Sequence, residues 1–282
     1  MKIVIFYFSG TGNTWWASSI LKSELESLGN TVEMYSLENP VLKEEGFTVK
    51  EIEKADQVIV GFPIYGSDLP TNMMDFIHDL PKVSDGKKFG AFCTQAGFSG
   101  DGCIFFKKDV EEKGYKFLQS FQIDLTTNFN VAMLPFSLSK PAEGDKLEKI
   151  KAKASIKIKK VAGKIAENKE YLEGKRFYQV LLGGLERAFF RRGKSKLPDK
   201  FKFSKDRCIK CRLCVNTCPT ENLFFELWNS DLKRKDKCLL CFRCYNFCPS
   251  LAINYGGKIK APEKYRRFTG PIQKLKISDI RK

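Results

Sequence analysis

Eight of the ten cysteines in this 282-residue chain fall into two runs of the same spacing, and each run ends in a proline. The runs are Cys208-x2-Cys211-x2-Cys214-x3-Cys218-Pro219 and Cys238-x2-Cys241-x2-Cys244-x3-Cys248-Pro249. Thiolates at these intervals wrap a cubic 4Fe–4S cluster, and the fourth cysteine of each run ligates the other cluster. We therefore expect one cluster on Cys208, Cys211, Cys214 and Cys248, and a second on Cys238, Cys241, Cys244 and Cys218.

Other uses of cysteine fit this spacing less well. Structural zinc sites favour two separated Cys-x2-Cys pairs that close into one tetrahedron, not a four-cysteine run given twice. Disulfides need an oxidising compartment, and nothing in the sequence points to one; ligating thiols instead imply a reducing, cytoplasmic setting. The two remaining cysteines, Cys93 and Cys103, are too few for a third cluster, and we expect Cys93 to be a small buried residue.

Residues 201–257, which contain both runs, resemble the bacterial two-cluster ferredoxins along their whole length. The resemblance implies a small α+β domain whose two 4Fe–4S clusters store and pass single electrons. Arg212 and Phe242 depart from the family pattern, because many members carry small residues at these positions. We expect this departure to change cluster potential or solvent access and to leave ligation unaffected.

The amino terminus carries a second, independent motif. Residues 2–8 form an apolar, β-branched and aromatic run that predicts a buried parallel strand. Apolar residues then recur at helical spacing from Trp16 to Leu28. Backbone N–H groups and the helix dipole favour a phosphate where a strand meets a helix in this way. The connecting loop consists of hydroxyl, amide and glycine residues: Ser9, Gly10, Thr11, Gly12, Asn13 and Thr14.

The composition of this loop indicates which phosphate it binds. A P-loop needs a lysine before its final Ser or Thr, and none is present. A dinucleotide fingerprint needs a third glycine, and Trp15 occupies that position. Three hydroxyls and an amide suit a single terminal phosphate, and Ser-Gly-Thr-Gly-Asn-Thr resembles the phosphate loop of flavodoxins. The resemblance implies FMN as the cofactor, and an ordinary glycine-rich turn is the alternative.

Later apolar runs alternate with helical segments and predict a parallel sheet. The flavodoxin resemblance implies a doubly wound α/β fold with strand order 2-1-3-4-5. The further strands are expected at residues 31–36, 57–61, 88–94 and 117–125. In this order FMN lies at the carboxyl ends of strands one and three. The resemblance implies that Tyr65 and Phe98 flank the isoalloxazine, and packing within the loops is the alternative. The other expected contacts are Pro63, Ile64, Gly66, Thr94, Gln95 and Gly97.

The chain divides into four expected segments: a flavodoxin-like FMN domain (1–172), a basic linker helix (173–200), a two-cluster ferredoxin domain (201–257) and a basic tail (258–282). Lys and Arg total 49 against 33 Asp and Glu, a formal charge of +16. Residues 177–192 mix apolar residues with arginines. This segment either packs the two domains together or lies on an anionic membrane surface.

Together these motifs predict an electron carrier that relays electrons between FMN, two clusters and redox partner proteins. The basic charge suggests partners with acidic docking surfaces, and nucleic acid is not expected because no reader motif appears. The alternative is a flavin-dependent oxidoreductase that acts on a small substrate over the FMN, with the ferredoxin domain as electron feed. For that reading the candidate substrate loop is 126–143, with Asn128, Phe129, Asn130 and Pro135.

Overall fold

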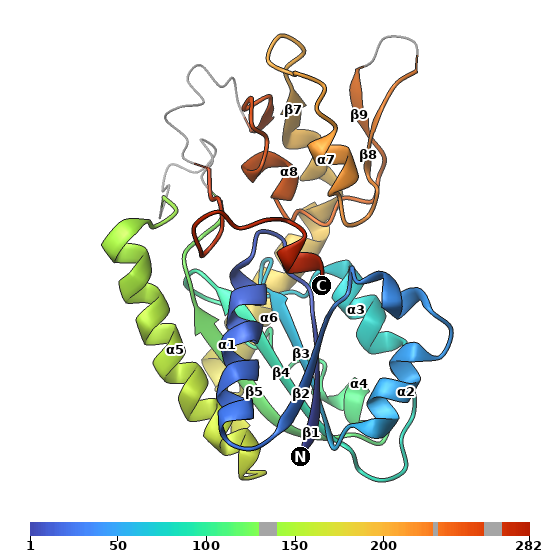
Figure 1. Ribbon diagram of the computed structural model, residues 1–282, viewed down its shortest axis with the longest axis vertical. Coiled ribbons are helices and arrows are strands. Elements are labelled where there is room, and N and C mark those ends of the chain that lie inside the picture. The colour runs from blue at the N-terminus through green and yellow to red at the C-terminus, as the bar shows by residue number, and fades with distance from the viewer. Residues whose placement is uncertain (130–139, 228–230, 257–266) are drawn as a thin grey trace.

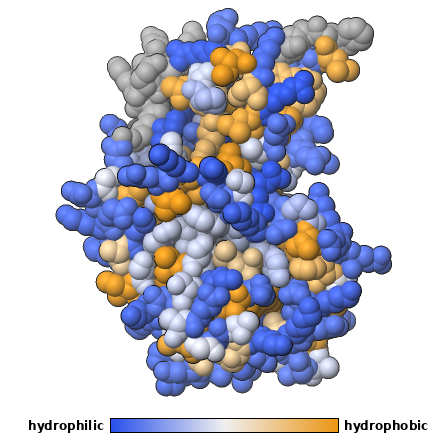
Figure 2. All heavy atoms as spheres, viewed as in Figure 1, coloured by the Kyte–Doolittle hydropathy of each residue, from blue (hydrophilic) through white to orange (hydrophobic). Residues whose placement is uncertain are grey.

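The computed structural model describes residues 1–129, 140–227, 231–256 and 267–282. A larger α/β domain carries a small cysteine-rich domain, which sits over the carboxyl ends of the central strands (Figure 1). On the face in view, hydrophilic residues dominate the larger domain, while apolar residues gather in the small one (Figure 2). No helix among the described residues is long and apolar enough to cross a bilayer.

The larger domain is built on one parallel sheet with the order β2-β1-β3-β4-β5-β6. This confirms the predicted flavodoxin-like order 2-1-3-4-5. The sixth strand pairs with Gln119 and Ser120 of the fifth and was not predicted, because two residues carry no periodic signal. The strands are β1 (Lys2–Tyr7), β2 (Thr31–Ser36), β3 (Gln57–Pro63), β4 (Lys88–Gln95), β5 (Lys116–Asp124) and β6 (Tyr171–Leu172).

Helices cover both faces of the sheet because its central strands are apolar on both sides. Ile3 and Ile5 of β1 pack against α1 (Asn13–Ser27) and α5 (Gly144–Ala166). The alternate side chains, Val4 and Phe6, pack in the core on the other face. That face is covered by α2 (Phe47–Lys54), α3 (Thr71–His78) and α4 (Lys107–Glu111). Cys93 is fully buried in this second core, as expected.

Helix α6 (Phe177–Gly193) connects the two domains. It crosses the loop after β4 so closely that a Cβ on Gly183 would lie 2.4 Å from the carboxylate of Asp101 and 3.0 Å from Cα of Gly100. Phe190, near its end, packs against the core of the small domain. Two short 3-10 turns, η2 (Lys194–Lys196) and η3 (Pro198–Lys200), complete the connection. Helix α6 therefore packs between the two domains, which is one of the two roles that its sequence allowed.

The small domain has the predicted α+β character. β7 (Phe201–Phe203) pairs antiparallel with β10 (Ile253–Tyr255), and β8 (Leu223–Phe225) with β9 (Leu232–Arg234). The one-turn helices are α7 (Leu213–Asn216) and α8 (Arg243–Asn246). Each begins after a residue in the left-handed conformation, Arg212 (φ 60°) or Phe242 (φ 57°). Side chains are disfavoured at positive φ, so smaller residues suit these two positions better.

Residues 267–282 were expected to belong to a basic tail, but they are packed: Arg267 and Phe268 bond to the small domain, and residues 271–282 return to the larger domain. The N–H of Ser36 donates to the carbonyl oxygen of Lys282 at 2.7 Å. Leu275 is buried, and so is Ile280 in the final turn η5 (Asp279–Arg281). The apolar side chains interspersed among the lysines and arginines decide this packing. The expected tail residues 258–266 lie outside the described residues.

Candidate functional site

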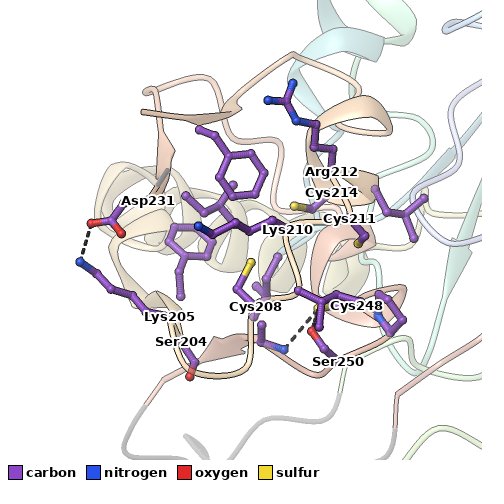
Figure 3. A pocket seen from close by; sticks show the side chains of 18 of the residues that line it. Ser204, Lys205, Cys208, Lys210, Cys211, Arg212, Cys214, Asp231, Cys248 and Ser250 are labelled. Atoms are coloured by element: carbon purple, nitrogen blue, oxygen red, sulfur yellow. Dashed lines mark hydrogen bonds and ion pairs between the residues drawn. The ribbon is translucent and has the colours of Figure 1, made fainter. Parts of the chain in front are cut away.

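The eight cysteines of the two runs line two cavities in the small domain. The outer cysteine cavity, of about 490 Å³, is lined by Cys208, Cys211, Cys214 and Cys248 (Figure 3). The inner cysteine cavity, of about 30 Å³, is lined by Cys218, Cys238, Cys241 and Cys244. The fold therefore brings the last cysteine of each run to the first three of the other. This is the grouping that the sequence predicted, and ligation of clusters at these sites stays a prediction.

The arrangement of the sulfurs suits a cluster. Among the residues that the structure describes, no three His, Cys, Asp or Glu side chains converge to hold a single metal ion. The cysteines surround a hollow instead, as an iron–sulfur cube with thiolates on its separate corners requires. Backbone N–H groups of Asn222, Leu240 and Ala252 donate to three of the sulfurs: Cys218 at 3.3 Å, Cys238 at 3.5 Å and Cys248 at 3.2 Å. Hydrogen bonds of this kind favour the thiolate form and tune cluster potential.

Without a cation, these thiols resist ionisation. Burial first, and then the charge of Cys248, raises the pKa of Cys214 to about 11. Burial raises the pKa of Cys241 to about 12, although the nearby Arg243 acts in the opposite direction. A bound metal lowers the pKa of these thiols instead, because coordination deprotonates a thiol outright. The donor set therefore fits a cationic iron core, whose binding would release protons.

The predicted phosphate loop, residues 9–14, connects β1 to the amino terminus of α1. Gly12 has a φ of 106°, which glycine tolerates, and its N–H donates to Oγ of Ser9 at 3.1 Å. The hydroxyl of Thr14 is 2.8 Å from that of Thr94, so the loops after β1 and β4 meet here. Thr11 accepts a hydrogen bond from the side-chain amide of Asn128 at 2.9 Å. The loop is therefore largely buried, held by hydrogen bonds to neighbouring loops and placed at a helix amino terminus.

A third cavity, the loop cavity, of about 340 Å³, opens between this loop and the loops after β3 and β4. Three buried polar atoms on its lining residues have no hydrogen-bond partner in the described structure: Oδ1 of Asn13, the hydroxyl of Tyr65 and Oε1 of Gln95. Unsatisfied buried polar groups are costly and call for a polar occupant. Eleven of the predicted contact residues line it: Ser9, Gly10, Thr11, Asn13, Thr14, Pro63, Ile64, Tyr65, Gly66, Thr94 and Gln95.

Three predicted contact residues do not reach the loop cavity. A Cβ on Gly12 would lie 2.5 Å from the side chain of Leu275, so this glycine faces the carboxyl-terminal segment. Gly97 and Phe98 do not line the cavity, and Phe98 is 43% exposed. The chain turns away there, because the N–H of Gly102 bonds back to Ser99 and the turn packs under α6. This geometry does not favour the contact of Phe98 with the isoalloxazine that the resemblance implied, and the contact stays a prediction.

The small domain supplies a wall that the sequence did not reveal. Leu240, Phe242 and Tyr255 line the loop cavity, and Phe129 joins them, with its ring 4.8 Å from that of Phe242. The only signal for this wall was the unusual Phe242 within its cysteine run. The hydroxyl of Tyr65 lies on the same side, because a Cβ on Gly10 would be 3.3 Å from it and 2.7 Å from the carbonyl oxygen of Cys241. Burial, and then the Cys241 sulfur, raise the pKa of this phenol. The other lining residues are Ala96, Phe190 and Leu197, together with Thr126, Thr127 and Asn128 of the candidate substrate loop.

Arg243, beside Cys244, joins the two domains at the phosphate loop. Its side chain is 1% exposed, and it donates to the carbonyl oxygens of Ser9 and Gly10, each at 2.8 Å. It also forms a bidentate ion pair with Glu38, which follows β2, at 2.7 and 2.5 Å. Burial alone lowers the pKa of Arg243, but the hydrogen bonds and charge of Glu38 outweigh it and raise the pKa. The guanidinium therefore stays charged between the cysteine loop and the phosphate loop.

Comparison with known proteins agrees with this division. Residues 4–132 match the family model of the flavodoxin domain, and residues 200–224, with the first cysteine run, match that of the 4Fe-4S binding domain. No curated protein matches the chain.

Similar solved structures include a flavodoxin from the domain Archaea, at 20% identity over 60% of this chain and 98% of its own, with a TM-score of 0.41. Flavodoxin 2 from Bacillus cereus is 22% identical over 60% and 99%, with a TM-score of 0.43. The two-electron reduced flavodoxin of Megasphaera elsdenii is 23% identical over 57% and 98%, with a TM-score of 0.37. With the phosphate loop in one matched segment and a cysteine run in the other, the chain is a fusion of a flavodoxin domain and a 4Fe–4S ferredoxin-type domain, an electron-transfer flavo-iron–sulfur protein.

Proposed function

We propose that this protein relays electrons within one chain, between FMN in the loop cavity and two 4Fe–4S clusters, and on to a redox partner protein in the cytoplasm. FMN exchanges one or two electrons and each cluster exchanges one. The inner cysteines hold the cluster next to FMN, and the outer cysteines hold the cluster that faces the partner. The phosphate loop favours FMN over FAD because it provides for a single terminal phosphate.

The observation that carries this proposal is the wall shared by the loop cavity and the inner cysteine cavity. Leu240 and Phe242 line the loop cavity, and the residue between them, Cys241, lines the inner cysteine cavity. A Cβ on Gly10 would lie only 2.7 Å from the carbonyl oxygen of Cys241. The phosphate loop and the cysteine loop are thus in direct contact. Electron transfer slows steeply with distance, so this contact favours direct exchange between FMN and the inner cluster.

The surroundings of the outer cysteine cavity suit an acidic partner. Cys211 is exposed, and the neighbouring Ile209 is 65% exposed. Lys202, Lys210, Arg212 and Lys233 contribute to the lining, and Lys205 pairs there with Asp231 (Figure 3). Positive charge around an exposed carrier steers negatively charged partners, and salt screens this attraction. We therefore propose that the acceptor or donor protein docks over the outer cluster through an acidic surface.

The test is photochemical reduction of the anaerobic protein at several dilutions, with flavin and cluster absorbance followed after the flash. Transfer within one chain gives a rate that does not depend on protein concentration or on salt, because the tether supplies an effective concentration in the millimolar range. A rate that rises with protein concentration would reject the internal relay. Cys211→Ser should spare exchange between flavin and inner cluster and slow transfer to an added acceptor protein, whereas Cys241→Ser should impair both.

The alternative prediction was an oxidoreductase that reduces or oxidises a small substrate over FMN. Of its candidate substrate loop, Asn128 and Phe129 line the loop cavity. Asn130 and Pro135 lie outside the described residues. The domain contact covers this side of the cavity with Phe242 and Tyr255, so we prefer the relay. Rapid reduction of a small organic compound without any protein acceptor would favour the enzyme instead.

A further inference from the structure

Helix α6 exposes an apolar face. Phe177, Leu181, Leu185 and Phe189 recur every fourth residue, which aligns them in one stripe along the helix. Phe177 is 82% exposed and Phe189 is 70% exposed. Two more side chains widen the stripe: Tyr178 and Leu182, each about half exposed. An exposed apolar patch of this extent usually marks an interaction surface.

The helix is oriented opposite to an ordinary surface helix, whose charged face meets water. Arg187 forms a bidentate ion pair with Asp101 at 2.9 and 3.0 Å, and both side chains are largely buried. Arg191 pairs with Asp68, at 2.8 and 2.9 Å. Gly183 permits the close crossing over the loop of Asp101. Specific ion pairs therefore hold the charged face inward and the apolar stripe outward.

Both ends of the stripe are basic. Lys175 and Arg176 precede Phe177, and Arg192 and Lys196 follow Phe189; all four are exposed. The chain as a whole carries a formal charge of +16. A second copy of this helix would bring like charges together, whether it paired parallel or antiparallel, which disfavours a dimer through this face. An anionic surface with an apolar interior complements both features.

We propose that the outer face of α6 docks onto the surface of an anionic lipid bilayer. The helix has 17 residues and no described helix is long and apolar enough to span a bilayer, so it lies in the plane of the interface. Its apolar stripe inserts at the boundary of headgroups and acyl chains, and the basic residues at its two ends bind lipid phosphates or carboxylates. This surface is separate from the loop cavity and the cysteines, so the proposal does not rest on the proposed function.

The experiment is co-sedimentation of the anaerobic holoprotein with vesicles of phosphatidylcholine alone or of phosphatidylcholine with phosphatidylglycerol. The protein should bind the anionic vesicles and bind the neutral ones much more weakly. Phe177→Ser combined with Phe189→Ser should lower partitioning by about tenfold or more, because two large apolar side chains no longer leave water. Flavin and iron content should not change, since neither ring contributes to a cofactor cavity.

The matched control is Ile156→Ser. Ile156 is 72% exposed on the lysine-rich helix α5 and should have no effect if α6 is the docking surface. Loss of binding in this control, with binding retained in the α6 variant, would overturn the assignment. So would the absence of binding to anionic vesicles, or a wild-type dimer in sedimentation velocity that the α6 variant dissolves. Hydrogen exchange on the wild-type protein needs no variant. Docking should protect the backbone amides of α6 from exchange when anionic vesicles are added, and lack of protection would contradict the proposal.

Discussion

Replacing Arg243 with Met should separate two effects of its guanidinium: stabilising the domain interface and shaping the phosphate loop. The side chain of Glu38 is only 5% exposed, and R243M leaves its carboxylate without the bidentate partner. Breaking a buried ion pair from one side costs about 3–5 kcal/mol. Arg281 lies 3.3 Å from the same carboxylate and offsets part of this loss. We therefore expect unfolding to become easier by about 3 kcal/mol.

The double variant R243M/E38M should regain most of this stability, because two apolar side chains in place of a buried ion pair are often neutral. FMN binding should not recover. The carbonyl oxygens of Ser9 and Gly10 still lack the donor that fixes their peptide planes, so the N–H groups of the loop are no longer held toward the phosphate. Hydrogen bonds from a charged donor contribute about 1.5–3 kcal/mol each. Loss of one such contribution raises the FMN Kd about tenfold or more.

Denaturant titration gives the stability, and FMN fluorescence titration of flavin-free protein gives the Kd. The matched control is R267M, because Arg267 donates to Tyr245, Ile253 and Asn254, all within the small domain. This control should leave the FMN Kd at the wild-type value even if it weakens the small domain. A wild-type FMN Kd in R243M/E38M would refute the argument that Arg243 shapes the phosphate loop.

Three further predictions concern the cofactor sites. Thr11→Val with Thr14→Val should weaken FMN binding at least about tenfold with unchanged iron content, and extraction of FAD from the wild type would contradict the phosphate assignment. The anaerobic protein should hold about eight iron per chain. Cys218→Ala should remove the EPR signal of the inner cluster, and loss of the EPR signal of the outer cluster instead would contradict the crossed ligation. Gly10→Ala should force the two domains apart at a cost of about 1–3 kcal/mol and slow flavin–cluster exchange. The control Gly97→Ala should behave as wild type, because nothing lies within 4 Å of its added Cβ. Equal exchange rates in both variants would argue against the contact between Gly10 and Cys241.

The sequence predicted those parts of the molecule whose signals are local. Strands such as β3 are continuous apolar runs, and the cysteine spacing dictates which sulfurs can share a cavity. Arg243 carried no such signal, because its role depends on Glu38 and the phosphate loop, more than 200 residues away. Helix α6 was recognised, but its orientation depends on Asp68 and Asp101, which no periodicity within the helix reveals. Features fixed by docking between distant segments were thus the ones that sequence patterns did not predict.

The return of residues 271–282 to the larger domain means that the ferredoxin-type domain is anchored at both of its ends. The hydroxyl of Tyr7, the last residue of β1, donates to the carbonyl oxygen of Ile280 at 3.3 Å, so the second anchor reaches an interior strand of the sheet. A carrier domain on a single linker moves through solvent between its partners, and solvent viscosity then limits the rate of electron transfer. A domain anchored at both ends can transfer electrons without this motion. Flavin–cluster exchange in this protein should therefore be insensitive to solvent viscosity, as sucrose or glycerol series would reveal.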